Sequence, residues 1–226
     1  MYFLIDNSTN VIFGWSAKCG CTHIKNIFNY LINNTTFYNK HHKNQMNYLP
    51  NNIENYTVII FCRNPYSRLV SGYLDKYKKS GEYRYRWVKN ILTFELFINE
   101  LLVNNWEVID NHHFTQQTSE AFDEEKLLKC KKLYCFDIAK INYSIIEQLF
   151  NKKLSNEIIN NIGNNNFKKD NEKLEKYIFN EDIDNYINYS FDYKYMYNDE
   201  LKKKVYKFYE YDFKFFKNLF NLDYTI

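Results

Sequence analysis

The feature that most constrains the fold is a run of strand-forming residues, Tyr56–Cys62, with the sequence Tyr-Thr-Val-Ile-Ile-Phe-Cys. A continuous run of this length, without polar alternation, is typical of a strand buried on both faces of a parallel sheet. Arg63-Asn64-Pro65 ends the run, and Pro65 suits the first turn of a helix. Apolar side chains then repeat with the helical period as far as Tyr77. The segment therefore predicts a strand followed by a helix, the basic unit of an α/β fold.

Other segments extend this alternation of strands and helices. Tyr2–Ile5 and Val11–Trp15 predict two strands around a turn, and Leu133–Phe136 predicts a further strand. The spacing of apolar residues predicts further helices at residues 24–32, 94–103, 143–150 and 199–219. Polar, irregular segments are expected at residues 35–55, 110–117 and 161–170. The order predicts one domain over residues 1–226, of the α/β class, with a mainly parallel sheet flanked by helices.

The expected last helix, residues 199–219, is long and amphipathic. Its apolar positions fall on one face. The side chains expected to point inward are Leu201, Val205, Phe208, Phe213 and Phe216.

Composition and charge limit the classes of function. The 226 residues include 30 Lys+Arg and 27 Asp+Glu, a net charge of +3 that is too small to indicate a nucleic-acid-binding protein. Five cysteines at irregular spacing disfavour a secreted disulfide framework. There is no signal-peptide pattern and no apolar run of about 18 residues, so a cytoplasmic protein without a transmembrane segment is expected. Abundant Asn, Lys, Tyr and Ile beside few Gly, Pro and Ala indicate an AT-rich genome.

The loop Ser16–Thr22 lies between an expected strand and an expected helix, where an anion-binding loop belongs. Backbone N–H groups at a helix N-terminus face an anion there, and the helix dipole favours its charge. A Walker A loop would need Gly-x4-Gly-Lys-Ser/Thr. In this chain Cys21 stands where that lysine should be, and Lys18 precedes Gly20 instead. The loop therefore predicts a phosphate site that differs from that of an ordinary nucleotide triphosphatase.

The end of the Tyr56–Cys62 strand carries the second candidate. Nucleotide triphosphatases place an aspartate near this position to hold Mg²⁺, but this chain has Arg63. A guanidinium can bind a terminal phosphate through two hydrogen bonds without a metal, and Ser71 follows on the next helix. Together the two segments predict a ligand with two separate anionic ends.

The same residues resemble those of a known family. Lys18-Cys-Gly-Cys-Thr22 is similar to the 5′-phosphosulfate-binding loop of sulfotransferases, and Arg63–Tyr73 resembles their 3′-phosphate-binding motif. Two weaker similarities, His113-Phe114 and the segment Val205–Phe216, are to the Golgi carbohydrate sulfotransferases of the HNK-1 type. Those enzymes carry an N-terminal membrane anchor, whereas this chain starts almost at its first strand. A soluble version of this group, with a three-layer P-loop-like fold, is therefore expected.

The resemblance implies a reaction and its donor. The sulfuryl group of 3′-phosphoadenosine 5′-phosphosulfate (PAPS) would pass in line to an acceptor hydroxyl or amine, most simply a carbohydrate hydroxyl. Adenosine 3′,5′-bisphosphate (PAP) would remain, and no metal would be required. The acceptor's identity, the sulfated position and the oligomeric state are left open.

The resemblance also implies roles for single residues. Lys18 and the amides of Gly20–His23 would neutralise the charge that builds up during transfer. Thr22 would donate to the 5′-phosphate, and Arg63 with Ser71 would hold the 3′-phosphate. Arg68 is expected to form a surface salt bridge. The residues implied to bind the donor are Lys18, Cys19, Gly20, Cys21, Thr22, His23, Arg63 and Ser71.

The acceptor hydroxyl needs a general base, and histidine is the usual choice. The candidates are His41, His42, His112 and His113, and the sequence does not separate His42 from His113 as the base. His42 lies between the two motifs, where the uronyl 2-O-sulfotransferases carry their catalytic histidine, whereas His113 has the downstream His-aromatic match. His23 is expected to cap the first helix and to pack near the nucleotide.

The sequence allows three other interpretations. A kinase-like or catalytically inactive nucleotide-binding protein is the alternative function, although the Walker lysine and the strand-end aspartate are missing. A zinc site is disfavoured, because a tight anion loop cannot easily wrap a tetrahedral metal. Its ligands would be Cys19, Cys21 and His23, completed by Cys130 and Cys135. A basic rim for an acidic or sugar acceptor is a further hypothesis, formed by Arg84, Arg86 and Lys89 beside Trp87.

Overall fold

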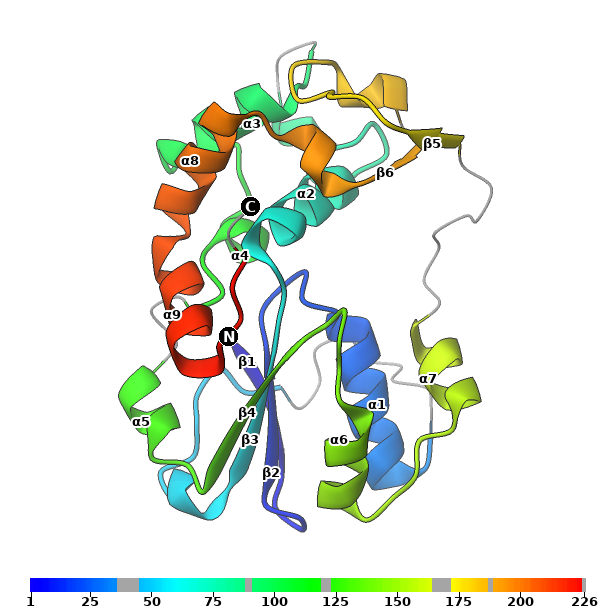
Figure 1. Ribbon diagram of the computed structural model, residues 1–226, viewed down its shortest axis with the longest axis vertical. Helices are drawn as coiled ribbons and strands as arrows, with labels where there is room; N and C mark the ends of the chain where they lie inside the picture. The colour runs from blue at the N-terminus through cyan, green and yellow to red at the C-terminus, as the bar shows by residue number, and fades with distance from the viewer. Residues whose placement is uncertain (36–44, 88–90, 119–122, 164–171, 187–188, 225–226) are drawn as a thin grey trace. The chain divides into compact units, whose positions relative to one another are not determined.

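The computed structural model describes residues 1–35, 45–87, 91–118, 123–163, 172–186 and 189–224 (Figure 1). The chain divides into two compact units. The sheet unit comprises Met1–Arg63 and Gln117–Phe167, and the aromatic unit comprises Asn64–Gln116 and Lys168–Ile226. That residues 1–226 form a single domain stays a prediction.

The sheet unit is built on four strands in the order β1-β2-β3-β4. Strand β1 (Tyr2–Asp6) pairs antiparallel with β2 (Val11–Trp15). Strands β2, β3 (Thr57–Cys62) and β4 (Lys132–Asp137) are parallel, and every residue of β3 is buried. The predicted α/β class with a mainly parallel sheet is confirmed, including the central place of the apolar run.

The turn between β1 and β2 is closed by a single carboxylate. Asp6 accepts hydrogen bonds from the backbone N–H groups and the hydroxyls of both Ser8 and Thr9. Burial of Asp6 raises its pKa, but these hydrogen bonds outweigh burial and hold the pKa below its ordinary value. Asn10 completes the turn with a left-handed backbone, which asparagine tolerates well.

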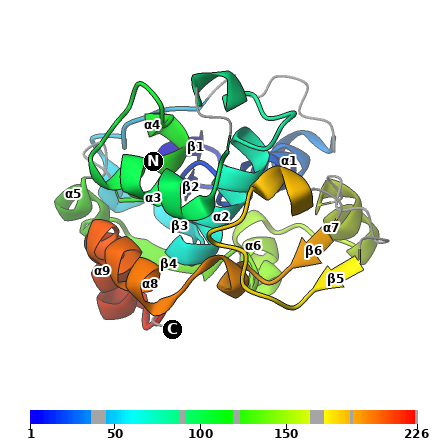
Figure 2. The same ribbon diagram turned by 90° about the horizontal axis from the view of Figure 1, so that it is seen from above.

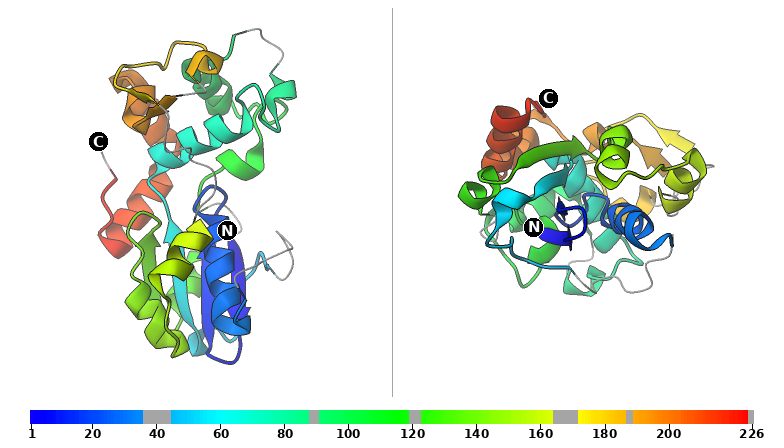
Figure 3. Two further views of the ribbon diagram at one scale, coloured as in Figure 1. Left: turned by 90° about the vertical axis from the view of Figure 1, so that its right-hand side faces the viewer. Right: turned by 90° about the horizontal axis from the view of Figure 1, so that it is seen from below.

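Helices cover the same side of this sheet. They are α1 (Cys21–Asn33), α6 (Tyr143–Phe150) and α7 (Asn156–Gly163), as Figures 1 and 3 show. The ring of Phe13 on β2 lies 5.1 Å from Phe28 of α1, 5.1 Å from Phe61 of β3 and 5.7 Å from Phe150 of α6, in edge-on contacts. Such contacts fix the helices against the sheet more specifically than apolar burial alone. A short helix α5 (Glu124–Leu128) precedes β4, and a 3-10 turn η1 (Ile53–Asn55) precedes β3.

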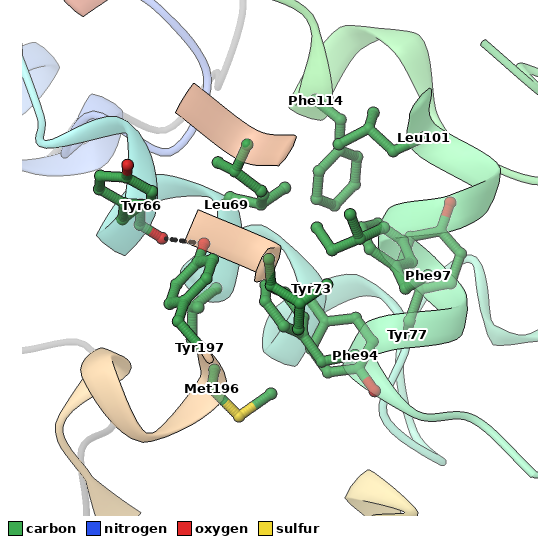
Figure 4. Close-up of a cluster of buried hydrophobic side chains, with 14 of the residues drawn as sticks. Tyr66, Leu69, Tyr73, Tyr77, Phe94, Phe97, Leu101, Phe114, Met196 and Tyr197 are labelled. Carbon is green, nitrogen blue, oxygen red and sulfur yellow. Dashed lines mark hydrogen bonds between the residues drawn. The ribbon is translucent and has the colours of Figure 1, made fainter. Parts of the chain in front are cut away.

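The aromatic unit has a different construction, with tyrosine and phenylalanine in place of a large sheet. Helix α2 (Pro65–Lys76) and helix α3 (Phe94–Leu102) supply many of its buried rings. Figure 4 shows Tyr73 of α2 beside Phe94 and Phe97 of α3, at ring distances of 5.1 and 5.0 Å. The buried tyrosines keep their hydroxyls bonded: Tyr197 donates to the backbone oxygen of Tyr66. Buried polar tips are thereby satisfied, as a stable core requires.

The aromatic unit contains further helices, 3-10 turns and a pair of strands. They are the 3-10 turns η2 (Arg84–Arg86), η3 (Ile183–Tyr186) and η4 (Tyr193–Met196), and helices α4 (Asn111–Phe114), α8 (Asp199–Phe208) and α9 (Glu210–Phe220). Strands β5 (Glu172–Leu174) and β6 (Tyr189–Phe191) pair in parallel, side by side in Figure 2.

Three segments differ from their predictions. The expected loop at residues 110–117 contains the helical turn α4, which Asp110 caps. The expected loop at 161–170 begins inside α7, and residues 164–170 lie outside the described part. The single helix expected at 199–219 is two helices, because Tyr209 leaves helical geometry and buries a hydroxyl that donates to the Phe114 carbonyl.

Most of the side chains expected to point inward from this last segment are buried, but Phe208 is only half-buried. None of the helices in the described segments has the length and hydropathy needed to cross a membrane.

Candidate functional site

The loop after β2 has the backbone of an anion-binding turn. Lys18 and Gly20 both adopt left-handed conformations, with φ of 66° and 72°, and the Cys19 N–H donates to the Ser16 carbonyl at 3.1 Å. Helix α1 starts directly after Gly20, which has no side chain to cap it. A helix start without a side-chain cap directs its first N–H groups and the positive end of its dipole toward an incoming anion.

The loop residues differ in their exposure. Lys18, Gly20, Cys21 and Thr22 are half-exposed and can reach a ligand, whereas Cys19 is fully buried. The Cys19 thiol donates to the Gln117 side-chain oxygen at 3.0 Å. The thiol and the amide of Cys19 are thus both used to hold the loop together.

The structure brings Arg63 to this loop. Its Nη1 donates to the Lys18 carbonyl at 3.2 Å, and its side chain is half-exposed. Arg63 is the first residue after β3, whereas the loop follows β2, so both come from the carboxyl ends of neighbouring parallel strands. Ligands of open α/β sheets bind at this edge. The Arg63 guanidinium therefore lies against the backbone of Lys18, and both residues were predicted from sequence to bind the ligand.

One residue that the sequence did not suggest joins the two segments. The Gln117 side chain accepts from the Arg63 N–H at 3.0 Å and donates to the Arg63 carbonyl at 2.8 Å. The Gln117 carbonyl accepts from the Ser16 hydroxyl at 2.8 Å. Gln117 sits in a segment expected to be a plain loop, and no local pattern marks it.

The rest of the Arg63–Tyr73 motif belongs to the aromatic unit. Asn64 caps α2 by accepting from the Tyr66 N–H at 2.9 Å, and Pro65 occupies the first turn as expected. Ser71 is half-buried on the same helix. The surface salt bridge expected for Arg68 is wrong: its side chain is 1% exposed and its Nη1 donates to the Thr115 carbonyl at 2.7 Å.

The candidate histidines have different surroundings. His41 and His42 lie outside the described residues. His23 does not cap α1, because its Nε2 bonds the Tyr143 hydroxyl at 2.8 Å. His112 is exposed, and its ring meets the His113 ring edge-on.

His113 forms a pair with a buried carboxylate. Its Nδ1 lies 2.5 Å from Asp110 Oδ2, and the same oxygen accepts from the His113 N–H at 2.9 Å. Burial of Asp110 raises its pKa, but the hydrogen bonds from His113 outweigh this effect and lower the pKa. An ionised Asp110 only accepts hydrogen bonds, so Nδ1 donates to it, and in a neutral imidazole this arrangement leaves Nε2 as the basic nitrogen.

The expected basic rim is only partly formed by the described residues. Trp87 is buried and its Nε1 donates to the Ile91 carbonyl, and Arg84 lies 3.5 Å from Asp184. Lys89 lies outside the described part. Arg86 stacks over the Tyr83 ring at 4.5 Å, and that ring lies 6.0 Å from the His113 ring. One cation of the rim therefore approaches the His113–Asp110 pair.

Two cysteines of the zinc alternative contact residues outside the proposed ligand set. Cys19 bonds Gln117, whereas the sulfur of Cys135 lies 3.4 Å from that of Cys62. Among the residues that the structure describes, no group of three or more His, Cys, Asp or Glu side chains is arranged to hold a metal ion.

A mainly parallel sheet with an uncapped helix start and an arginine at its carboxyl edge defines a P-loop-like α/β protein. Comparison with known families is more specific, since residues 1–220 match the sulfotransferase family. The chain belongs to that family. No curated protein and no solved structure matches it at a significant level.

Proposed function

We propose that this chain transfers the sulfuryl group of PAPS to a hydroxyl of a carbohydrate acceptor. The observation that supports this best is the hydrogen bond from Arg63 to the Lys18 carbonyl, which joins a 5′-side loop to a 3′-side cation. The donor set suits such a ligand. An uncapped helix start and Lys18 suit a phosphosulfate, and a half-exposed guanidinium suits a terminal phosphate.

The residues would divide the work by position. The N–H groups of Gly20–His23 and the Thr22 hydroxyl would bind the 5′-phosphate, whereas Arg63 and Ser71 would bind the 3′-phosphate. Lys18 would place its ammonium beside the oxygens that gain charge as transfer proceeds, a stabilisation worth several kcal/mol in a preorganised site. Cys19, also expected from sequence to bind the donor, holds this loop in shape together with Gln117.

The donor supplies a sulfuryl group whose bond to a 5′-phosphate oxygen breaks as the acceptor oxygen bonds to sulfur. His113 is the proposed general base, because Asp110 holds Nδ1–H and leaves Nε2 to take the hydroxyl proton. Asp110 then stabilises the imidazolium that forms. His42 stays an alternative base predicted from sequence alone.

The proposed acceptor is a sugar with an acidic group. Tyr83 presents an aromatic ring beside His113, and Arg86 stacks over that ring. An aromatic face and a cation next to the base suit a sugar ring and its carboxylate or sulfate. A screen of glycan, steroid, tyrosyl-peptide and small-alcohol acceptors tests this, and preference for a neutral alcohol would contradict it.

Ligand-induced stabilisation tests the donor site without an acceptor. A ligand that binds only the folded state raises the unfolding midpoint by mass action. We expect PAP to raise the midpoint of the full chain and ATP with Mg²⁺ to have little effect. Stabilisation by ATP–Mg²⁺ alone would favour the kinase-like alternative and contradict the proposal.

A further inference from the structure

The side-chain amide of Gln117 bonds two segments that are distant in sequence. It is 1% exposed, and its oxygen accepts from the Arg63 N–H and from the Cys19 thiol, both at 3.0 Å. Its nitrogen donates to the Arg63 carbonyl at 2.8 Å. Gln117 is 54 residues from Arg63 and 98 from Cys19 along the chain.

These bonds lie just past the end of a strand ladder. Trp15 and Phe61 are the last paired residues of β2 and β3. Beyond that pair the Gln117 amide bonds both backbone groups of Arg63, much as a neighbouring strand would. Its carbonyl also accepts from the Ser16 hydroxyl at the start of the loop. The place where each segment leaves the sheet is thereby set by one residue.

Only a glutamine side chain offers this combination. Glutamate has acceptors alone, so it would face the Arg63 carbonyl with an oxygen and would bury a charge. Asparagine is one methylene shorter. Methionine fills a similar volume with no hydrogen bonds, so it tests the bonds while preserving most of the packing.

We propose that Gln117 is a positioning residue that sets Arg63 against the 5′-side loop, and thereby sets the affinity for a nucleotide phosphorylated at both ends. This inference rests on the proposed function of that site. Gln117 acts through Arg63 and the loop, so its loss should reduce the advantage that a 3′-phosphate confers.

The experiment compares two probes on the full chain by calorimetry: PAP, and adenosine 5′-monophosphate, which lacks the 3′-phosphate. The dissociation constant of adenosine 5′-monophosphate divided by that of PAP measures how much the 3′-phosphate adds to the affinity. We expect Gln117→Met to lower that ratio about tenfold, equivalent to about 1.4 kcal/mol. Gln117→Glu should lower it at least as much. In an Arg63→Ala background the Gln117→Met change should not alter this ratio further, because Gln117 affects the 3′-phosphate only by positioning Arg63.

Gln116→Met is the matched control, since Gln116 donates to the Phe208 carbonyl within the aromatic unit. It should alter the unfolding midpoint while leaving the ratio unchanged. A ratio unchanged in both folded Gln117 variants would overturn the inference while leaving the donor site intact. A wild-type chain that binds neither probe, or binds both equally, would instead overturn the proposed function and the inference with it. Should Gln117→Met fail to fold, the same comparison can be made with Gln117→Asn, which keeps the amide group but is one methylene shorter.

Discussion

The two units build their candidate site residues in different ways. In the sheet unit, the candidate site is made largely of backbone: a loop with left-handed Lys18 and Gly20, an uncapped helix start and the end of a buried strand. In the aromatic unit, the candidate base depends on side chains, with Asp110 and His113 held at the turn α4. The position of a site made of backbone groups is determined by where the strands end. A pair such as Asp110 and His113 depends instead on the identity of both side chains and on the burial of the carboxylate.

This contrast predicts different sensitivities to substitution. Changing a side chain in the sheet unit should remove one cation and leave the backbone N–H groups in place. Changing Asp110 or His113 should remove the proton acceptor itself or its orientation. The predictions below run from the largest expected effect to the smallest.

Lys18→Ala should nearly abolish sulfuryl transfer, by about a thousandfold in kcat, because the transition-state charge would lose the cation proposed to neutralise it. Its side chain is half-exposed, so the unfolding midpoint should change little. Turnover measured with a radiolabelled sulfate donor, together with a melting curve, checks both statements. Wild-type turnover in Lys18→Ala would show that the proposed mechanism is wrong.

His113→Ala should lower kcat by about a hundredfold, within the range for a general base. Asp110→Asn should also lower it, because an amide donor facing Nδ1 favours the tautomer that puts the proton on Nε2. The pH–rate profile of each variant checks this, and the fall in rate at low pH, where a general base is protonated, should disappear in His113→Ala. His112→Ala is the matched control, since His112 is exposed and should retain full turnover. An unchanged profile in His113→Ala would transfer the role to His42.

Arg63→Ala should raise the KM for the donor about tenfold to a hundredfold with a smaller change in kcat, because a charge-assisted phosphate contact is lost. Arg68→Ala provides the comparison. Its buried guanidinium donates to the Thr115 carbonyl, so this change should lower the unfolding midpoint. Steady-state kinetics and melting curves separate the two outcomes. A donor KM unaffected by Arg63→Ala would remove Arg63 from the site.

Asp6→Asn should have the smallest effect, and on stability alone. The folded-state pKa of Asp6 is lowered, so its stabilisation is fully present above the ordinary value of 3.8 and is lost as the pH falls through the folded pKa. At pH 7 the variant should unfold about 2–4 °C lower for each kcal/mol lost. Melting curves from pH 7 to pH 3 should show this difference shrink, while turnover stays unchanged. A difference that grew on acidification would contradict the assignment.

Local sequence patterns correctly predicted the strand, the helix start and the loop that surround the candidate site. The run Tyr56–Cys62 predicted a buried parallel strand, and Pro65 the start of a helix, because both depend on near neighbours in sequence. The loop before α1 was found in the same way. Where long-range contacts decide, local patterns were wrong: Arg68 is buried against Thr115, and the last helix is broken where Tyr209 bonds Phe114.

The Asp110–His113 pair is local in sequence, but its pairing was not predicted. The two residues are three apart, so an N-cap pattern could have suggested it, but no apolar periodicity followed to mark a helix. His113 was chosen as a candidate without its partner. The pairing matters because burial of Asp110 and its hydrogen bonds define which nitrogen of His113 is basic.

The sequence by itself determined the four strands of the large sheet, the loop before α1 and the arginine after β3, because each is encoded in a few consecutive residues. The joining of these parts by Gln117 was decided only by the tertiary structure. A hydrogen bond between residues 54 or 98 positions apart leaves no periodic trace in the chain. Such a bond forms only where folding brings the ends of β2 and β3 together and excludes water from the amide between them.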